Sequence, residues 1–328
     1  MESPLPVTDR IVNRPTRLFL APAGTLGCAA LALAAACAPA GDAPGAAMAT
    51  AEGNLITGEG LPNPAPTVVT NWGELPEGRE WGHTAGVDID PNDGHIWAYE
   101  RCASGQLSGG NVDCETNPVP PIFKFDRNTG EVLANFGADI FVTPHGIHAA
   151  DDGTLWVTDF AGNDAGTRGH QVHQFSVDGV LMMSLGVAGQ AGSEPGYLNQ
   201  PNDVIVGPDG SIYVSDGHNG QNMTTNGAMQ AGIEAGNTAR IVKFSPEGEY
   251  LMEWGGIGVE HGQFRTPHAL EFDSRGRLWV ADRGNHRLEI FDQDGNYLES
   301  RYAYGRISGI FITDDDMVYA IDSESSPT

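Results

Sequence analysis

Short alternations of apolar and polar residues run through most of this 328-residue chain, and one of them recurs five times. In each copy an aromatic residue is followed by two further residues and then by an acid, as W-A-Y-E, W-V-T-D, Y-V-S-D, W-V-A-D and Y-A-I-D at 97–100, 156–159, 213–216, 279–282 and 319–322. Turn-forming Asp, Asn or Gly residues precede each copy, and a polar loop follows it. One small β-unit is therefore repeated along the chain.

Each repeat is long enough for four short strands. In the second copy the alternating segments are 143–148, 155–159, 171–175 and 180–186, and in the third they are 200–206, 212–216, 240–244 and 250–255; the fourth copy matches from 266 to 305. A sheet of this size cannot bury both faces alone, so neighbouring sheets must stack, which is typical of a β-propeller. We predict an all-β propeller with four complete four-stranded blades and a fifth that stops after its second strand.

The sequence predicts a closing strand near the N-terminal end of the propeller and a missing part at its C-terminal end. Segment 67–73 resembles the outermost strand of the later blades and is predicted to complete the last blade, joining the ends of the ring. A six-bladed ring would need roughly sixty to ninety further residues, so we expect the chain to be truncated at its C-terminus. Segment 219–237, rich in Gly and Asn, is interpreted as an ordinary flexible insertion, with a lid beside the site as the alternative.

The N-terminal region has the features of an export signal. Three arginines precede a charge-free, Ala/Leu-rich run at 18–36, and small residues follow it, so residues 1–37 are predicted to be a signal peptide. Cleavage before Cys37 would leave a lipid attachment site, whereas the small residues at 38–40 suit ordinary cleavage. We expect residues 38–53 to form a flexible linker and 54–328 the propeller. The protein is predicted to be exported, to the periplasm or the extracellular space, with membrane anchoring through a lipidated Cys37 as the alternative.

The net charge and hydropathy of the chain argue against several classes of partner. The chain has 17 basic and 43 acidic residues and a formal net charge of −26. Nucleic acid and anionic membrane surfaces are poor partners for such a protein. No second apolar stretch is long enough to span a bilayer, so no transmembrane domain is expected after signal removal.

Two cysteines remain after the signal segment. Cys102 and Cys114 lie in a short loop between two predicted strands. In an oxidising compartment they are expected to form a disulfide that restrains the Ser/Gly-rich loop between them. Without a partnering Cys or His pair nearby, they give only a weak zinc signal.

The candidate chemistry gathers on one face of the propeller. The start of an innermost strand and the end of the antiparallel strand beside it lie at the same face. Pro-His pairs open two innermost strands at His145 and His268, and three second strands end near Arg101, His218 and Arg283. Imidazoles from separate strands suit zinc, and the arginine fork suits a carboxylate. The alternatives are that each Pro-His is a turn and that the arginines only pair with neighbouring acids.

The repeats resemble NHL repeats, and their motifs resemble the peptidyl-α-hydroxyglycine α-amidating lyases (peptidylamidoglycolate lyases) and their bacterial relatives. The similarity covers residues 67–323. The motifs that carry it are W-G at 72, G-V-D-I-D-P at 86–91, P-H-G-I at 144–147, Q-P-N-D-V at 200–204, V-S-D-G at 214–217, T-P-H-A-L at 266–270 and V-A-D-R at 280–283. The resemblance implies a six-bladed propeller, of which about four and a half blades are present.

The resemblance also implies roles for individual residues. His145 and His268 match two of the three zinc-binding histidines of the family; the third lies in a sixth blade that this chain lacks. Arg101 and Arg283 match arginines of its substrate site, and Ile147 matches a position whose carbonyl binds a structural calcium. His218 stands where the family has its catalytic tyrosine, and a histidine can serve as a base near neutral pH.

The activity implied is that of a carbon–nitrogen lyase, which cleaves a peptidyl-α-hydroxyglycine to a peptide amide and glyoxylate, with a peptide or small carboxylate-bearing molecule as substrate. The alternative is a non-catalytic NHL propeller that binds a peptide or a cell-envelope partner. A calcium lactonase or esterase propeller would need Glu, Asn and Asp on inner strands around one ion. Only Asn202 and Asp203 meet that requirement, so this reading ranks last.

Overall fold

The computed structural model describes residues 69–70, 72–102, 113–302 and 304–322. They all belong to one compact unit, residues 51–328. The predicted signal peptide and linker lie outside the described residues. Among the described helices, none has the length and apolar character that crossing a membrane requires.

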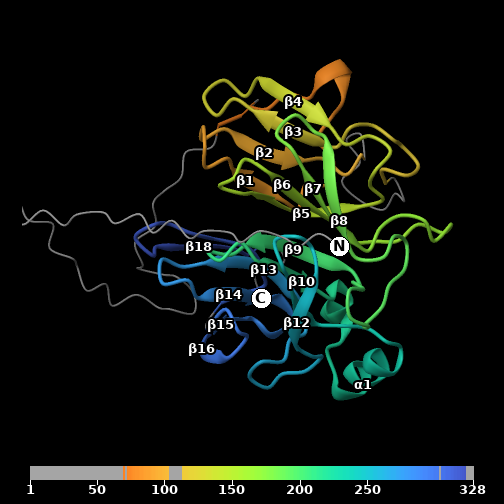
Figure 1. The fold of residues 1–328 in the computed structure, drawn as a ribbon, viewed down its shortest axis with the longest axis vertical. Helices are drawn as coiled ribbons and strands as arrows, with labels where there is room; N and C mark the ends of the chain where they lie inside the picture. Colours follow the sequence, from red (N-terminus) through yellow and green to blue (C-terminus); the bar gives the residue numbers. More distant parts are fainter. Residues whose placement is uncertain (1–68, 71, 103–112, 303, 323–328) are drawn as a thin grey trace, which may run out of the picture. The chain divides into compact units, whose positions relative to one another are not determined.

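Strands dominate the described chain, in the order expected of successive blades (Figure 1). Four antiparallel sheets follow one another, and a two-stranded sheet comes last. The first sheet contains β1 (Val87–Ile89), β2 (Ile96–Tyr99), β3 (Ile122–Phe125) and β4 (Val132–Phe136), and the second contains β5 (Pro144–Ala149), β6 (Leu155–Asp159), β7 (Gln171–Phe175) and β8 (Leu181–Leu185). The third sheet contains β9 (Pro201–Val206), β10 (Ile212–Asp216), β11 (Arg240–Phe244) and β12 (Tyr250–Gly255), and the fourth contains β13 (Pro267–Phe272), β14 (Leu278–Asp282), β15 (Arg287–Phe291) and β16 (Tyr297–Arg301). The fifth sheet contains only β17 (Ile307–Ile312) and β18 (Val318–Asp322) among the described residues. The predicted all-β propeller of four four-stranded blades and a two-stranded remainder is confirmed.

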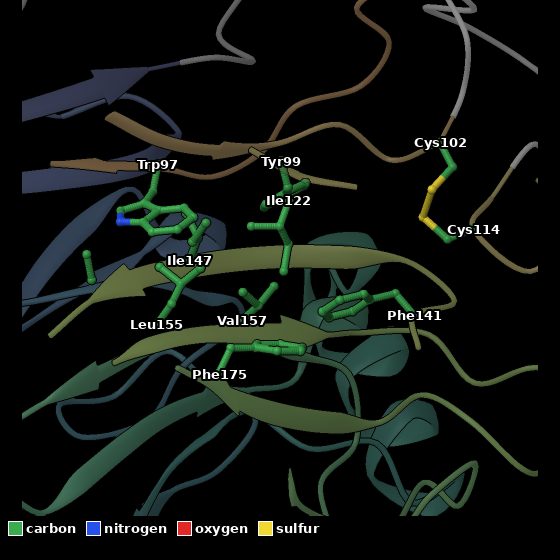
Figure 2. Packing of buried hydrophobic residues seen from close by; sticks show 11 residues of the cluster. Trp97, Tyr99, Cys102, Cys114, Ile122, Phe141, Ile147, Leu155, Val157 and Phe175 are labelled. Atoms are coloured by element: carbon green, nitrogen blue, oxygen red, sulfur yellow. A yellow bond between two sulfur atoms is a disulfide. The ribbon is translucent and has the colours of Figure 1, made fainter. Parts of the chain in front are cut away.

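Most of the hydrophobic core lies between successive sheets. Figure 2 shows the cluster between the first two sheets, where Trp97 and Ile122 face Leu155 and Phe175. Similar clusters join the second sheet to the third, the third to the fourth, and the fourth to β17 and β18. The first strands of successive sheets, β1, β5, β9, β13 and β17, also contact one another. The segment before β1 also covers apolar residues of the first sheet, through Leu75 and Trp81. Because most apolar surface is removed from water by the stacking of sheets, each sheet depends on its neighbours.

The register of each inner pair places strand starts opposite strand ends. Pro144 pairs with Asp159, Pro201 with Asp216 and Pro267 with Asp282. A register shift follows each of these pairs, so the first residues of β5, β9 and β13 leave the regular ladder. Such irregularities re-aim side chains beside functional sites. The residues after each proline are His145, Asn202 and His268.

The structure confirms the predicted disulfide but not the predicted strand before the first sheet. The Cys102–Cys114 disulfide is present, and Figure 2 shows it beside the first core cluster. The predicted strand at 67–73 is wrong where it is described, since Trp72 instead lies against Phe125 of the first sheet, with ring centroids 5.5 Å apart. Residues 67, 68 and 71 lie outside the described residues.

The insertion after β10 is helical rather than irregular. It forms η2 (His218–Asn222) and α1 (Asn226–Glu234), and Thr225 caps α1 by accepting a hydrogen bond from the Ala228 amide. The other short helices are η1 (Pro76–Gly78) and η3 (Arg283–Asn285). The contacts of η2 with η3 place the start of the insertion beside the ends of β10 and β14.

Candidate functional site

Three imidazole rings meet where the inner strands begin. One ring nitrogen each from His145, His218 and His268 lies within 4.8 Å of the other two. The ring centroids of His145 and His268 are 4.8 Å apart, and that of His218 is 5.0 Å from His145 and 5.7 Å from His268. Within the part of the chain that the structure describes, no other group of three histidine, cysteine or acidic residues meets so closely.

Backbone carbonyls of the following sheets orient two of the rings. The His145 Nδ1 lies 2.9 Å from the Asn202 carbonyl oxygen, and the His268 Nδ1 lies 2.9 Å from the Ser308 carbonyl oxygen. A carbonyl can only accept, so Nδ1 carries the proton in both rings and Nε2 keeps its lone pair. In metal-ligating histidines, the ring nitrogen that does not bind the metal typically donates its N–H to a carbonyl or carboxylate, as Nδ1 does here.

The same two rings are held neutral. Burial is the main cause that holds the pKa of His145 well below its usual value, and the nearby His268 and Arg101 oppose a second positive charge there. Burial and the nearby Arg283 have the same effect on the pKa of His268. Metal ligation needs the neutral imidazole, so the surroundings favour the form that can bind a cation.

His218 reaches the cluster because η2 packs closely on the fourth sheet. A Cβ at Gly220 would come within 1.3 Å of the Arg265 carbonyl oxygen, so only glycine allows this approach. The next residue, Gln221, has its Nε2 3.5 Å from the His218 Nδ1, and its Oε1 accepts a hydrogen bond from Arg283. The insertion thus supplies two side chains to the site.

The two predicted arginines lie on either side of the cluster in different environments. Arg283 is buried, and its Nη1 lies 3.5 Å from the Ser308 hydroxyl in addition to its contact with Gln221. Arg101 is partly exposed, and its Nε donates to the Pro144 carbonyl over 2.8 Å. Among the described residues Arg101 forms no ion pair, so its guanidinium can meet an anionic ligand.

A cavity of about 850 Å³ contains these side chains and continues along the inner strands. The cavity is lined by the three histidines, both arginines and Gln221, and also by Ile147. Further along lie Asp88, His148, Asp203 and Glu271, which belong to four different sheets. The volume suits a small molecule or the end of a peptide.

Burial strongly affects the acids that line the cavity away from the three histidines. Burial raises the pKa of Asp203 to about 7 and that of Glu271 to about 8. Burial lowers the pKa of His148, but the hydrogen bond and charge of Asp88 outweigh it and raise the pKa. The His148 Nδ1 lies 3.4 Å from an Asp88 carboxylate oxygen. These groups sit beside the site but none of them is in the three-histidine cluster.

The sequence predicted most of these positions, but not every partner. All five predicted polar site residues, His145, His268, His218, Arg101 and Arg283, line the same cavity, as does Ile147. The family resemblance implies a base at His218 and a third metal ligand in a sixth blade, whereas the structure puts the His218 ring beside the other two imidazoles. No sequence motif pointed to two further residues, Gln221 and Phe160; the Phe160 ring centroid lies 5.5 Å from that of His145.

Comparisons with known proteins agree with the repeat pattern. The family model described as NHL repeat matches residues 264–291. The chain is 35% identical over 246 residues to the mouse peptidyl-glycine alpha-amidating monooxygenase, covering 66% of this chain and 22% of that protein. It is 35% identical over 182 residues to human NHL repeat-containing protein 3, covering 54% and 46%.

A protein of Caenorhabditis elegans named as a probable peptidyl-alpha-hydroxyglycine alpha-amidating lyase is 27% identical over 226 residues, covering 65% of this chain and 56% of that protein. The chain thus spans between about a fifth and somewhat over half of these relatives. Among solved structures, a streptogramin B lyase aligns with a TM-score of 0.47 at 15% identity, covering 73% of this chain and 61% of that one. The chain is an NHL-repeat β-propeller protein related in sequence to the peptidyl-α-hydroxyglycine α-amidating lyases.

Proposed function

We propose that this protein is a metal-dependent, lyase-like propeller that cleaves a peptidyl-α-hydroxyglycine to a peptide amide and glyoxylate. The observation that carries the proposal is the meeting of His145, His218 and His268, with ring nitrogens within 4.8 Å of one another. Relatives named as amidating lyases or monooxygenases point to the same reaction class.

The residues present fit a zinc ion. Three imidazoles from separate segments are a common zinc donor set that leaves one position for water or substrate. Two of the rings present an unprotonated Nε2 because their Nδ1 atoms donate to carbonyls. We therefore assign His145, His218 and His268 as the ligands. A calcium ion at the Ile147 carbonyl remains a prediction of that resemblance.

The reaction needs few groups besides the ion. A bound zinc would polarise the substrate hydroxyl and favour loss of its proton. As the hydroxyl oxygen forms the C=O bond of glyoxylate, the C–N bond breaks and its electron pair stays on the amide nitrogen. That nitrogen takes up one proton, equal to the one that the hydroxyl gives up, so the cleavage needs no further reactant. Arg101 is assigned to the substrate carboxylate, because its guanidinium forms no ion pair among the described residues and its fork suits a carboxylate. Arg283, held by Gln221 and Ser308, is assigned to the same end of the substrate.

Metal content of the purified protein tests the proposal. We expect about one zinc per chain by elemental analysis, lost when His145, His218 or His268 is replaced by Ala. His286→Asn is the control, because it removes an exposed histidine outside the cluster and Asn tolerates the left-handed backbone there, φ 57°. The same analysis reads calcium. The zinc-loaded protein should then release glyoxylate from an N-acyl-α-hydroxyglycine.

The opposite result supports the second candidate. If the wild type holds no zinc, or if all three alanine variants retain it, the metal site is excluded. The chain would then be a non-catalytic NHL propeller that binds a peptide or an envelope partner, a function compatible with its similarity to NHL repeat-containing protein 3.

A further inference from the structure

Phe160 occupies a position that carries arginine in other sheets. It follows the last residue of β6, and its amide donates to the Thr143 carbonyl over 3.1 Å. Arg283 follows the last residue of β14 in the same way, with its amide 2.9 Å from the Thr266 carbonyl. The second sheet thus presents an aromatic ring on the face where the fourth presents a guanidinium.

The Phe160 ring contacts three groups of the proposed site. Its centroid is 5.5 Å from that of His145 and 5.1 Å from that of His218. The Arg101 guanidinium carbon lies over the ring, 5.5 Å from its centroid. A guanidinium at this distance is attracted by the negative face of the ring. No other described aromatic residue has both an arginine and cluster histidines as ring partners.

Besides its interaction with the Tyr99 hydroxyl, two described contacts restrict the direction of the Arg101 guanidinium. One is the hydrogen bond from Nε to the Pro144 carbonyl, about which the rigid guanidinium plane can still pivot as a whole. The other is the Phe160 ring, which restricts the plane of the guanidinium. An arginine reads a carboxylate best when its fork is oriented beforehand, because less side-chain freedom is then lost on binding.

We propose that Phe160 is a positioning residue, which orients Arg101 toward a ligand carboxylate and so sets the preference of the site for carboxylate over uncharged ligands. The proposal rests on the proposed function, in that Arg101 is the group that binds the carboxylate. Phe160 itself touches neither the carboxylate nor the reacting atoms. Its effect is exerted through the guanidinium and appears in ligand selectivity.

The test compares two unreactive ligands that differ only in charge. N-benzoylglycine has a carboxylate and N-benzoylglycinamide has a carboxamide; neither has the hydroxyl needed for cleavage. Their dissociation constants are measured by calorimetry on the zinc-loaded wild type, Phe160→Leu and Phe160→Tyr. We expect Phe160→Leu to reduce the preference for the carboxylate about fivefold, since a ring–guanidinium contact is lost while apolar volume is kept. Phe160→Tyr should retain the preference.

Three controls make the outcome decisive. Phe123→Leu makes the same change at another Phe–Arg contact, with Arg79 5.0 Å from the ring, outside the cavity, and should leave the preference unchanged. In an Arg101→Gln background, Phe160→Leu should have no further effect, because it acts through Arg101. Zinc content, measured in each variant, should not change.

The failures of the two proposals are distinguishable. If Arg101→Gln leaves the carboxylate preference unchanged, the assignment of Arg101 in the proposed function is wrong. If Arg101→Gln lowers it but Phe160→Leu does not, or if Phe160→Leu weakens both ligands equally, only the role of Phe160 is overturned. A Phe160→Tyr variant that loses the preference would contradict it as well.

Discussion

His145 and His268 face each other with ring centroids 4.8 Å apart, although they open the inner strands of two sheets that have a third between them. The intervening β9 has Asn202 at the equivalent position, and its carbonyl accepts a hydrogen bond from the His145 Nδ1. The distance between the two rings is therefore set by the stacking of three sheets. Substitutions that alter this stacking should act on the site from outside it.

The first prediction concerns the close approach that brings His218 to the cluster. Gly220→Ala should displace η2, because its Cβ would come within 1.3 Å of the Arg265 carbonyl oxygen. His145 and His268 would remain, so zinc should still bind, but about tenfold more weakly or worse, as when the support of a ligand is lost. Competition with a chromophoric chelator measures the affinity.

Gly227→Ala is the matched control for this change. Gly227 lies in α1, and a Cβ there would meet open space. Because alanine favours helix over glycine, this variant should bind zinc like the wild type. An unchanged affinity in a folded Gly220→Ala variant would mean that His218 is not a ligand.

The second prediction concerns a buried acid without the arginine that its counterparts have. Asp216 bonds Arg240 and Asp282 bonds Arg287 across the strand pair, but the residue paired with Asp159 is Gln171. Burial raises the pKa of Asp159 to about 7, although the amides of Val142 and Thr143 donate to it.

The sign of the pH effect follows from that shift. The folded protein keeps the Asp159 proton that the unfolded chain releases near pH 4, so this stabilisation is fully present below about pH 4 and is lost as the pH rises through about 7. A shift of about three pKa units corresponds to at most about 4 kcal/mol. Asp159→Asn should remove this part of the pH dependence, as seen in urea unfolding between pH 4 and 8.

Gln171→Arg should also reduce the pH dependence of the free energy of unfolding, but by stabilising the charged form of Asp159. The new guanidinium would lie opposite the Asp159 carboxylate and stabilise its charged form, lowering its pKa and raising the free energy of unfolding above pH 7. Gln174→Arg adds the same charge to β7 at a position that pairs with Trp156 and should not flatten the profile. Equal pH profiles for the wild type and both Asp159→Asn and Gln171→Arg would contradict the argument.

The third prediction separates buried from exposed ion pairs in the fourth sheet. The Arg287 Nε lies 3.0 Å from Asp282, and its Nη1 lies 3.3 Å from Glu289, with all three side chains buried. Arg287→Met leaves two buried carboxylates without their cation and should lower the free energy of unfolding by about 3–5 kcal/mol.

Arg301→Met provides the comparison. Arg301 pairs with Glu299 over 2.9 Å, and both side chains are largely exposed. Its loss should cost no more than about 1 kcal/mol. Urea unfolding at neutral pH measures both variants, and similar losses in the two would refute the distinction.

Much of the fold could be read from the sequence because a propeller repeats. The aromatic-to-acid phrase marks β2, β6, β10, β14 and β18, and the alternation around it gives the other strands. The segment at 67–73 shows the limit of this reasoning. Its pattern resembled an outer strand, but Trp72 found an aromatic partner in Phe125, and no local pattern reports such a contact.

The sequence by itself determined the repeated strands and the face to which His145, His218, His268, Arg101 and Arg283 belong, because the order of antiparallel strands fixes which ends lie together. Only the tertiary structure decided that His218 joins the other two imidazoles, that Gln221 bonds Arg283 and that Phe160 lies under Arg101. These relations depend on how far successive sheets rotate and how closely η2 approaches the fourth sheet. Both are set by packing between residues distant in sequence, which no local pattern encodes.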